Sequence, residues 1–469
     1  MNLTFKVLMM KFILKLTFFI LVILFGCTGS KSKNQDTTNQ LGNTTLKTQN
    51  NKAVLNVIGH WMKEGKKGNL VREWANEFEF LNQEYAINLV FPEQLYWDPN
   101  DRAYCEAKFL KNVLKADTQK WDILRINGDY LNIAEIMKDP EWPKKYLVDF
   151  SEIPEFKKYT LPGLLSDSIK HFWRGIIPGP FLEGFNWSVW FNKELAKEIG
   201  INVKQYGMTA EDFIGYVKAI DSYNKKNNKH IYPIFHCNSW STIYALGLQL
   251  YISEAGYSND DSYTERKLEA WHKTLKFFEE IAKANAYNYD WKKFSWDESW
   301  DYPLTKKCFF YINASWMYAI WEKVDINLVQ NMIPAELPTF KTPNIYMGGY
   351  QVTWAVPKNA PHREEAIKYL LFLNKPDYAE KWARYTKCPT GILGSVSSSA
   401  LGMDHFEEFN YYIEKKYGLR KFNFIDDAEP ILGNSRKKIK IFMPEVAFGQ
   451  MTADEAMAEI RKELKNFTH

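Results

Sequence analysis

The sequence predicts an α/β fold made of two lobes, and three observations lead to this prediction. The chain has 469 residues, which is too many for one typical core of about 100–200 residues. Hydrophobic residues make up 46% of the chain and charged residues 25%, so most of it can fold around buried cores. Short β-branched segments alternate with segments of helical periodicity, which is the order typical of α/β proteins.

Residues 1–26 are predicted to be a secretory signal rather than part of the fold. Three lysines precede the apolar run 16–25, which is shorter than the ~20 residues that a transmembrane helix needs. The run ends in Leu-Phe-Gly-Cys27, which is similar to the bacterial lipobox, where the cysteine receives a lipid and becomes the new N-terminus. An ordinary signal peptide with an incidental cysteine is the alternative, and translation could begin at Met1 or Met10.

Residues 27–52 are predicted to be a lipidated cysteine and a flexible tether. Residues 28–52 are rich in Asn, Thr, Gln, Ser and Lys, and only Leu41 and Leu46 are apolar, so this stretch buries too little surface to fold. As a random coil it would span about 25–30 Å. We therefore expect an extracytoplasmic protein that is anchored to a bacterial membrane on its periplasmic or cell-surface side.

The chain after the tether begins with a predicted β-α-β-α-β unit. Residues 54–58, 86–91 and 121–126 are the predicted strands. A second helix is expected around 109–114, and the first carries apolar residues at intervals of three or four, at Leu70, Trp74, Phe78 and Leu81. This order favours a parallel sheet covered by helices on both faces.

A second alternating block starts near Trp187. Two of its predicted helices begin with a threonine that is followed three residues later by an acid, Thr209 to Asp212 and Thr452 to Glu455. Such pairs are typical of the capping box that starts a helix. The last helix is expected to bury Met457, Ile460 and Leu464.

The composition and the motifs exclude several functional classes. The formal charge falls from +4 to +1 when residues 1–26 are removed, so the concentrated basic face of a nucleic-acid binder is absent. The histidines and the remaining cysteines show no metal-ligand spacing, so neither a metal nor a cofactor is expected. We expect these cysteines to be small buried residues, with one disulfide left open as an alternative: Cys105, Cys237, Cys308 and Cys388.

The sequence contains no motif that requires an enzyme. GxSxG, HExxH, GxGxxG and the P-loop are all absent. A glycoside hydrolase or lyase would need two carboxylates on either side of one bond, and Asp297, Glu298 and Asp301 could supply such a pair. A solvated acidic turn is the other interpretation of these residues, and it is the more common one. We therefore expect a protein without catalytic activity.

Several segments in a fixed order resemble the extracellular sugar-binding proteins of ABC importers, of the maltose-binding-protein type. They run from about residue 53 to the C-terminus and include FNWSVWFNKELAKEIGI (185–201), FYINASW (310–316), LPTF (337–340), GGYQVTWAVPK (348–358), HREEAIKYLLFL (362–373) and GQMTADEA (449–456). Ala314 stands where the family usually has glycine. Each segment alone is a weak signal, but together with the lipobox they indicate this family.

The resemblance implies a periplasmic-binding-protein-like fold of type II, with two α/β lobes, a hinge and a ligand cleft between the lobes. Lobe one would hold residues 53–182 and 338–375, and lobe two would hold 183–337 and 376–469. The crossing segments would lie near 180–186, 334–340 and 374–378. The implied function is capture of a carbohydrate, most simply an oligosaccharide, by hinge closure. The implied partners are the permease and ATPase of an ABC transporter, and the binding protein would be a monomer.

The same resemblance implies a set of ligand-binding residues. Trp316 occupies the family's stacking position, where an aromatic ring packs on the C–H face of a sugar. Asp129 matches a loop carboxylate of the family, and the alternative is that it caps the start of the following helix. His236, Asn238 and Trp240 follow a predicted strand, where the family places cleft residues; for each of them a structural role is equally open. Further residues on predicted cleft loops are His60, Trp61, Asn186, Tyr350 and Gln351.

Two functions from other classes remain as alternatives. One is the glycoside hydrolase or lyase, which product release would reveal. The other is a surface sugar receptor or adhesin with the same two-lobed body but no transport partner.

Overall fold

The computed structural model of the chain describes most residues beyond position 51. These are residues 52–61, 64–92, 95, 102–117, 119–126, 130–237, 241–257, 264–295, 298–395, 403–422 and 436–467. The predicted signal, Cys27 and all but the last residue of the predicted tether lie outside this set, as do Asp129, Asn238, Trp240 and Asp297.

The first lobe contains the predicted β-α-β-α-β unit. Strands β1 (Ala53–Ile58) and β2 (Tyr85–Val90) pair in parallel and are joined by α2 (Lys66–Leu81), so this part of the prediction is confirmed. The third strand is shorter than predicted, because β3 covers only Leu124–Arg125 and meets β1 through the single parallel bridge Val57–Ile123. Its ladder partner comes from far along the chain and is antiparallel, β9 (Trp354–Ala355).

Helices cover this small sheet. They are α3 (Arg102–Leu114), α4 (Tyr130–Met137), α5 (Trp142–Tyr146), α6 (Pro154–Tyr159), α7 (Asp167–Phe172), α14 (Arg363–Leu373) and α15 (Pro376–Thr386), with 3-10 turns at Phe150–Glu152 and Pro162–Leu165. The predicted apolar stripe on α2 buries Leu70, Trp74 and Phe78, but Leu81 at the end of the helix is exposed.

The second lobe is built on a six-stranded mixed sheet in the order β10-β8-β4-β6-β5, with β7 also paired to β4. The pairs β5–β6 and β10–β8 are parallel, and β4 is antiparallel to β6, β7 and β8. The strands are β4 (Glu183–Asn192), β5 (Tyr232–Phe235), β6 (Cys308–Ala314), β7 (Met332–Ala335), β8 (Tyr346–Gln351) and β10 (Lys421–Phe422).

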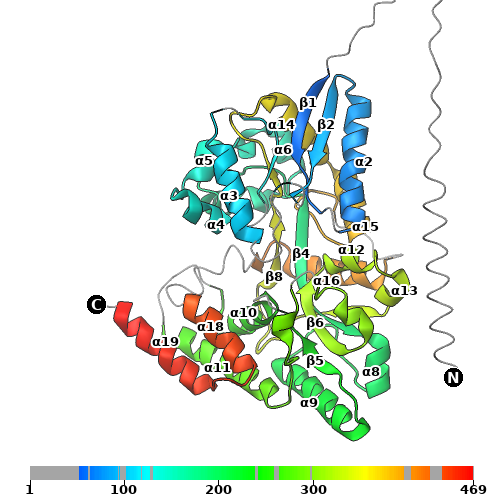
Figure 1. Ribbon diagram of the computed structural model, residues 1–469, viewed down its shortest axis with the longest axis vertical. Coiled ribbons are helices and arrows are strands. Elements are labelled where there is room, and N and C mark those ends of the chain that lie inside the picture. The colour runs from blue at the N-terminus through cyan, green and yellow to red at the C-terminus, as the bar shows by residue number, and fades with distance from the viewer. Residues whose placement is uncertain are drawn as a thin grey trace, which may run out of the picture. The chain divides into compact units, whose positions relative to one another are not determined.

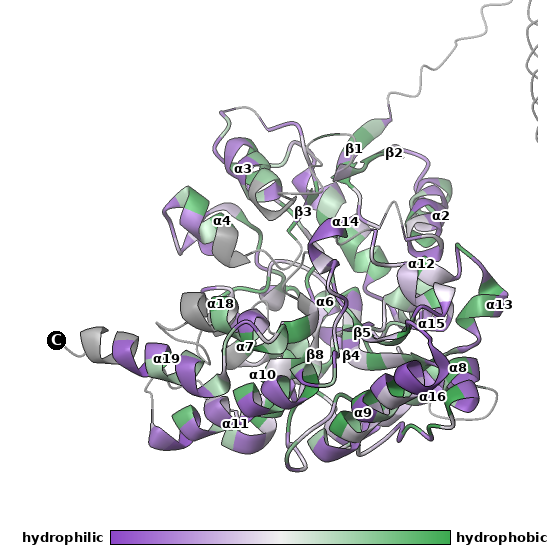
Figure 2. Ribbon diagram, turned by 60° about the horizontal axis from the view of Figure 1, so that its bottom comes forward, coloured by the Kyte–Doolittle hydropathy of each residue, from purple (hydrophilic) through white to green (hydrophobic). Residues whose placement is uncertain are grey.

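Helices α9, α10 and α11 provide most of the packing in this lobe. Helix α10 packs on β6 and β8, and α11 packs on α9, α10, α18 and α19. The helices are α8 (Lys193–Ile199), α9 (Ala210–Asn227), α10 (Ser241–Ala255), α11 (Glu265–Ala282), α12 (Met317–Trp321), α13 (Ile326–Val329), α16 (His405–Tyr417), α18 (Arg436–Ala447) and α19 (Ala453–Phe467), with 3-10 turns at Trp291–Lys293 and Tyr302–Thr305. Figure 2 shows hydrophilic beside hydrophobic residues along α9, α11 and α19, as expected for helices with one buried face.

The two predicted helix starts are both present. The Thr209 hydroxyl accepts from the Asp212 N–H while the Asp212 carboxylate accepts from the Thr209 N–H, so the capping box is complete. Thr452 and Glu455 make the same reciprocal pair in front of α19. That helix buries Met457 and Ile460, as the spacing predicts. Among the described residues, no helix is long and apolar enough to cross a membrane.

The chain passes between two large cores, one in each lobe. One core is formed by residues from Leu55 to Leu182 and from Val352 to Ile392. The other starts at Phe185 and holds residues up to Met347 and from Phe442 to Ile460. Figure 1 shows how β4 extends from the sheet of the second lobe toward the first, with β8 beside it. The two lobes of the predicted fold are therefore present, and the predicted residue boundaries between them stay a prediction.

Many aromatic residues in the described part of the chain pack in these two cores or in the smaller cluster under β6. Eight tryptophans are among the largest fully buried side chains: Trp74, Trp142, Trp187, Trp190, Trp271, Trp321, Trp354 and Trp382. The four described cysteines carry free thiols, and Cys237, Cys308 and Cys388 are buried, as the prediction of small core residues requires. Cys105 is half-buried.

Candidate functional site

The paired first half of β4 and β8 brings several predicted ligand residues together where the chain passes between the lobes. In this antiparallel ladder Glu183 lies opposite Gln351, and Asn186 lies opposite Gly348. Two glycines allow the close packing here. A Cβ on Gly184 would lie 2.8 Å from the Tyr350 ring, and one on Gly348 would lie 2.5 Å from the Phe185 carbonyl oxygen. No larger residue fits at either position without moving the neighbouring strand.

A buried ion pair joins the first lobe to the start of β4. The Lys67 ammonium, which has no exposed surface, donates to the carboxylates of Glu183 and Glu64, the latter at 2.8 Å. Trp61 Nε1 donates to the other Glu183 oxygen at 2.9 Å. Burial alone would lower the pKa of Lys67, but the groups that face it, Cys388, Glu183 and Glu64, outweigh burial and raise it. Lys67 is therefore charged in the folded protein.

A second buried network lies on the β8 side of the ladder, around Glu414 of α16. Its carboxylate accepts from the Tyr350 hydroxyl and from the Lys421 ammonium, and Asn186 Nδ2 donates to it at 3.3 Å. The same Asn186 nitrogen donates to Asn410 Oδ1 at 2.8 Å. Burial and the facing Glu414 raise the pKa of Tyr350, so its phenol is a neutral hydrogen-bond donor. Asn186 and Tyr350 thus meet through an acid that the sequence interpretation did not select.

Trp316 lies where the cores of both lobes meet. Its ring is half-buried, packs against both large cores and a third cluster under β6, and lies 5.0 Å from the Phe185 ring and 5.7 Å from the Trp187 ring. The preceding Ser315 is bound to Asn186 in both directions, through its backbone N–H at 2.9 Å and its hydroxyl at 3.3 Å. Trp316 is therefore tied to the β4–β8 ladder and keeps part of its ring accessible.

Trp61 and His60 are core residues in this structure. Trp61 has a positive φ of 63°, a conformation that few non-glycine residues adopt. Its indole lies 4.7 Å from the Trp382 ring and 5.6 Å from the Trp354 ring, and the buried His60 ring packs on it at 4.4 Å. Trp61 contacts the site through its hydrogen bond to Glu183, which is a positioning contact.

The predicted site residues thus fall into three groups. The β4–β8 ladder brings together Asn186, Tyr350 and Gln351, with Trp316 beside them and Trp61 behind Glu183. His236 lies apart, at the carboxyl end of the edge strand β5. Asp129, Asn238 and Trp240 lie outside the described residues, so their place in the site stays a prediction, as does that of the others.

Sequence reasoning missed Lys67, Glu183 and Glu414. Glu183 had a detectable signal, because it is the lone acid in the apolar and aromatic run 176–192, where a charge needs a partner. Lys67 had none, since it is one of several lysines in a polar stretch of sequence at the start of α2, and its burial depends on a residue 116 positions away.

An ion pair also connects the lobes at the surface. Lys66 Nζ lies 2.5 Å from Glu322 Oε1, just after α12, and 5.7 Å above the Tyr385 ring of α15. Both side chains are partly exposed, so this pair contributes little to stability, about 0–1 kcal/mol. It can still favour one arrangement of the lobes over another.

His236 is a neutral, buried histidine, and stability should depend on pH because of it. Its ring nitrogen Nδ1 contacts the Thr242 hydroxyl, and burial lowers its pKa to about 3. In the unfolded chain the same ring binds a proton below about pH 6.5. The unfolded state therefore binds more protons between these values, and stability should fall as the pH drops below 6.5, by up to about 1.4 kcal/mol per pH unit.

Urea unfolding between pH 4 and 7 measures how much His236 contributes to the pH dependence of stability. His236→Asn, which keeps a polar group near Thr242, should show a shallower loss of stability toward low pH than the wild type. The same substitution at the exposed His230 serves as the control and should follow the wild type. Equal slopes in the wild type and His236→Asn would contradict the prediction.

The acidic turn that could have served a hydrolase has a local structural role. The Glu298 carboxylate is exposed and accepts from the backbone N–H and the hydroxyl of Ser295, at 2.9 and 2.8 Å. These bonds lower the pKa of Glu298, which disfavours a general acid there. Across the described part of the chain, no group of three His, Cys, Asp or Glu side chains is placed to hold a metal ion.

The comparisons with known proteins decide the family. The sequence matches the profile of the bacterial extracellular solute-binding proteins over residues 107–407, which is more than half of the chain. The chain belongs to this family. Membership places this solute-binding protein outside the cytoplasm and confirms the resemblance found in its sequence. No curated protein sequence matches it.

Solved structures show the same fold. RafE in complex with raffinose has a TM-score of 0.62 and 14% identity, over 87% of this chain and 98% of its own. A chitin oligosaccharide binding protein has a TM-score of 0.65 and 14% identity, over 88% and 98%. A sugar transporter protein from Bacillus licheniformis in complex with stachyose has a TM-score of 0.56 and 19% identity, also over 88% and 98%. The periplasmic-binding-protein-like fold of this solute-binding protein is thus confirmed.

Proposed function

We propose that this solute-binding protein captures an oligosaccharide between its two lobes and does not transform it. The observation that carries the proposal is the position of Trp316, whose half-buried ring lies between the two cores and beside the polar network of the β4–β8 ladder. A sugar needs both kinds of group, since its C–H face packs on an aromatic ring and its hydroxyls need donors and acceptors.

The electrostatics of the junction support a neutral ligand. Lys67 and Lys421 are each neutralised by a buried glutamate, Glu183 and Glu414, so these strong charges are already paired. A charged solute would have to compete with those ion pairs, whereas a sugar hydroxyl can join the network at its amide and phenol groups. The solved structures with the same fold were determined with raffinose and stachyose or are named for chitin oligosaccharides.

The proposed mechanism is binding followed by closure of the hinge. A ligand that contacts both lobes binds the closed form more tightly than the open form. It therefore shifts the protein toward the closed form, by an amount set by the difference between the two affinities. The closed protein would then deliver the sugar to the permease of an ABC transporter, whose ATPase drives uptake. Cys27, carrying a lipid, would hold the mature monomer beside the membrane.

A thermal-shift screen tests this function. The mature protein, from Cys27 onward, is incubated with di- to tetrasaccharides of glucose, galactose, xylose and N-acetylglucosamine. At least one sugar should raise the melting temperature, because a ligand at 100 times its Kd stabilises the folded state by about 2.7 kcal/mol. Small-angle scattering with that sugar should show a smaller radius of gyration.

Product analysis of the same mixtures separates binding from catalysis. The stabilising sugar should be recovered intact after prolonged incubation, and Glu298→Ala should bind it as the wild type does. Release of shorter sugars that is lost in Glu298→Ala or Asp297→Ala would favour a hydrolase or lyase instead. Indifference to every sugar would contradict the proposal.

A further inference from the structure

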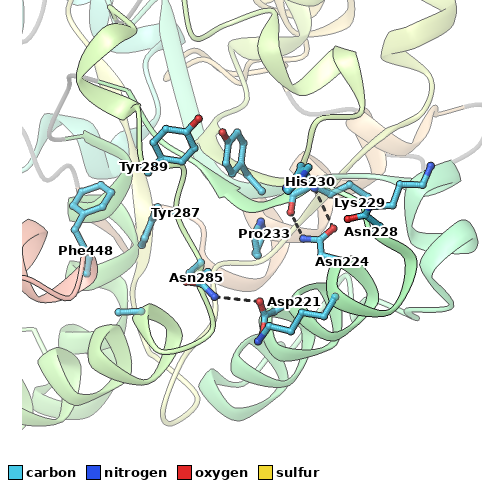
Figure 3. Close-up of a pocket in the computed structure, with 16 residues that line it drawn as sticks. Asp221, Asn224, Asn228, Lys229, His230, Pro233, Asn285, Tyr287, Tyr289 and Phe448 are labelled. Atoms are coloured by element: carbon cyan, nitrogen blue, oxygen red, sulfur yellow. Dashed lines mark hydrogen bonds and ion pairs between the residues drawn. The ribbon is translucent and has the colours of Figure 1, made fainter.

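A pocket lies in the second lobe, at the amino end of β5. It has a volume of about 740 Å³ and lies between the C-terminal end of α9 and the segment that follows α11. Figure 3 shows Tyr287, Tyr289 and Phe448 on one side and Asn224, Asn228 and His230 on the other. Predicted cleft residues such as Asn186 and Tyr350 are not among those that line it.

One wall of this pocket is aromatic. Tyr289 is 83% exposed, and its ring stands edge-on to the half-buried Tyr232 ring at 6.3 Å. Phe448 lies deeper and is 5.3 Å from the Tyr287 ring. Such a wall offers ring faces and edges to a ligand, while Tyr289 at the rim contributes almost nothing to the core.

The opposite wall is polar and held in place by its own hydrogen bonds. Asn224 binds both backbone groups of Ile231, accepting from its N–H at 3.1 Å and donating to its carbonyl at 2.7 Å. Asn285 donates to Asp221 Oδ1 at 3.3 Å, and the other Asp221 oxygen pairs with Lys225 at 2.5 Å. These contacts fix the wall and leave the exposed Asn228 amide at its edge.

Tyr287 carries a buried hydroxyl that has no hydrogen-bond partner among the described residues. The residue is 8% exposed and lines the cavity. Burial raises the pKa of Tyr287, so the phenol stays a neutral donor. Buried polar groups in folded proteins nearly always have a partner, so this hydroxyl is a candidate donor to a polar atom of a ligand.

We propose that this pocket is a second carbohydrate site, separate from the junction of the lobes. Tyr289 would pack on the C–H face of a pyranose ring, and Tyr287 and the amides of Asn228 and Asn285 would bind its hydroxyls. The volume suits a di- or trisaccharide, within the range of about 300–1,000 Å³ typical of ligand pockets. The charged side chains of the lining, Asp221, Lys225 and Lys229, disfavour an apolar partner.

Hydrogen–deuterium exchange on the mature protein tests the proposal and locates the ligand. Oligosaccharides of two to four units, neutral and uronic, should slow exchange in residues 224–233 and 284–290. The protection should disappear in Tyr289→Ala, whose exposed side chain can be removed without disturbing the core. The protection should persist in Trp316→Ala. Loss of sugar binding at the junction can therefore be distinguished from loss of binding at the pocket. Phe80→Ala, which removes a ring that is 76% exposed in the first lobe, is the matched control.

Tyr287→Phe tests the buried hydroxyl. This variant should keep or slightly raise the melting temperature, because it removes an unpaired polar group, but should weaken sugar binding at the pocket about 3- to 10-fold. The proposal is overturned if no oligosaccharide protects these residues, if Tyr289→Ala is protected as strongly as the wild type, or if only inorganic phosphate protects them. An unchanged affinity in Tyr287→Phe would also overturn it.

Discussion

Lys67→Met is expected to destabilise the folded protein by about 3–5 kcal/mol, because it leaves the Glu183 carboxylate buried without its ion-pair partner. Methionine has nearly the volume of the lysine stem, so little packing is lost. The remaining contact of Glu183, the hydrogen bond from Trp61 Nε1, cannot neutralise a charge that is 3% exposed. Urea unfolding at pH 7, followed by circular dichroism, measures the loss.

The pH dependence and the double variant identify the cause. With Lys67 removed, Glu183 should have a pKa above that of an unfolded glutamate, since burial already raises it. The folded variant then binds a proton more tightly than the unfolded chain, so its loss of stability relative to the wild type should become smaller as the pH falls toward 5. Lys67→Met with Glu183→Gln should recover most of the stability, because a neutral amide oxygen can still accept from Trp61.

The neighbouring lysine supplies a matched control. Lys66 lies one residue earlier on α2, and its ammonium pairs with Glu322 where both side chains are partly exposed. Lys66→Met should therefore change stability by no more than about 1 kcal/mol. Equal losses in the two methionine variants, or a double variant no more stable than Lys67→Met, would show that the buried pair does not hold β4 against the first lobe.

Local signals in the sequence predicted local structure well. The capping pair Thr209–Asp212 and the apolar stripe of α2 depend on residues within a few positions of one another, and both are present in the structure. The third strand was predicted too long, because its ladder depends on β9, which lies about 230 residues further along the chain. Pairing between distant segments leaves no periodic signal in either one.

The site was harder to predict for the same reason. A loop after a strand was expected to present Trp61 to the cleft, but Trp354 and Trp382, about 300 residues away in sequence, enclose its ring. Glu414 was not selected, although it joins Asn186 and Tyr350, because it lies 228 residues from Asn186 on a helix of ordinary amphipathic pattern. The resemblance to a family predicts contacts between distant residues only for residues that lie within the family's motifs.

Trp316→Ala is expected to weaken oligosaccharide binding by about 30-fold or more, the loss of about 2 kcal/mol that defines a strong contact residue. Trp316→Phe, which keeps an aromatic face and part of the packing, should bind at an intermediate strength. Calorimetric titration with the sugar that raises the melting temperature measures both affinities. A ring that only joins the cores would lower stability in these variants without this graded loss of affinity.

Trp300→Ala separates the two roles of the Trp316 ring. Trp300 is another half-buried tryptophan of the second lobe, and its ring packs against the cluster under β6. Its removal should lower the melting temperature much as Trp316→Ala does, yet leave the affinity of the remaining folded protein unchanged. If Trp316→Ala binds sugar as tightly as Trp300→Ala does, Trp316 acts only as a packing residue between the lobes and the ligand must be held elsewhere.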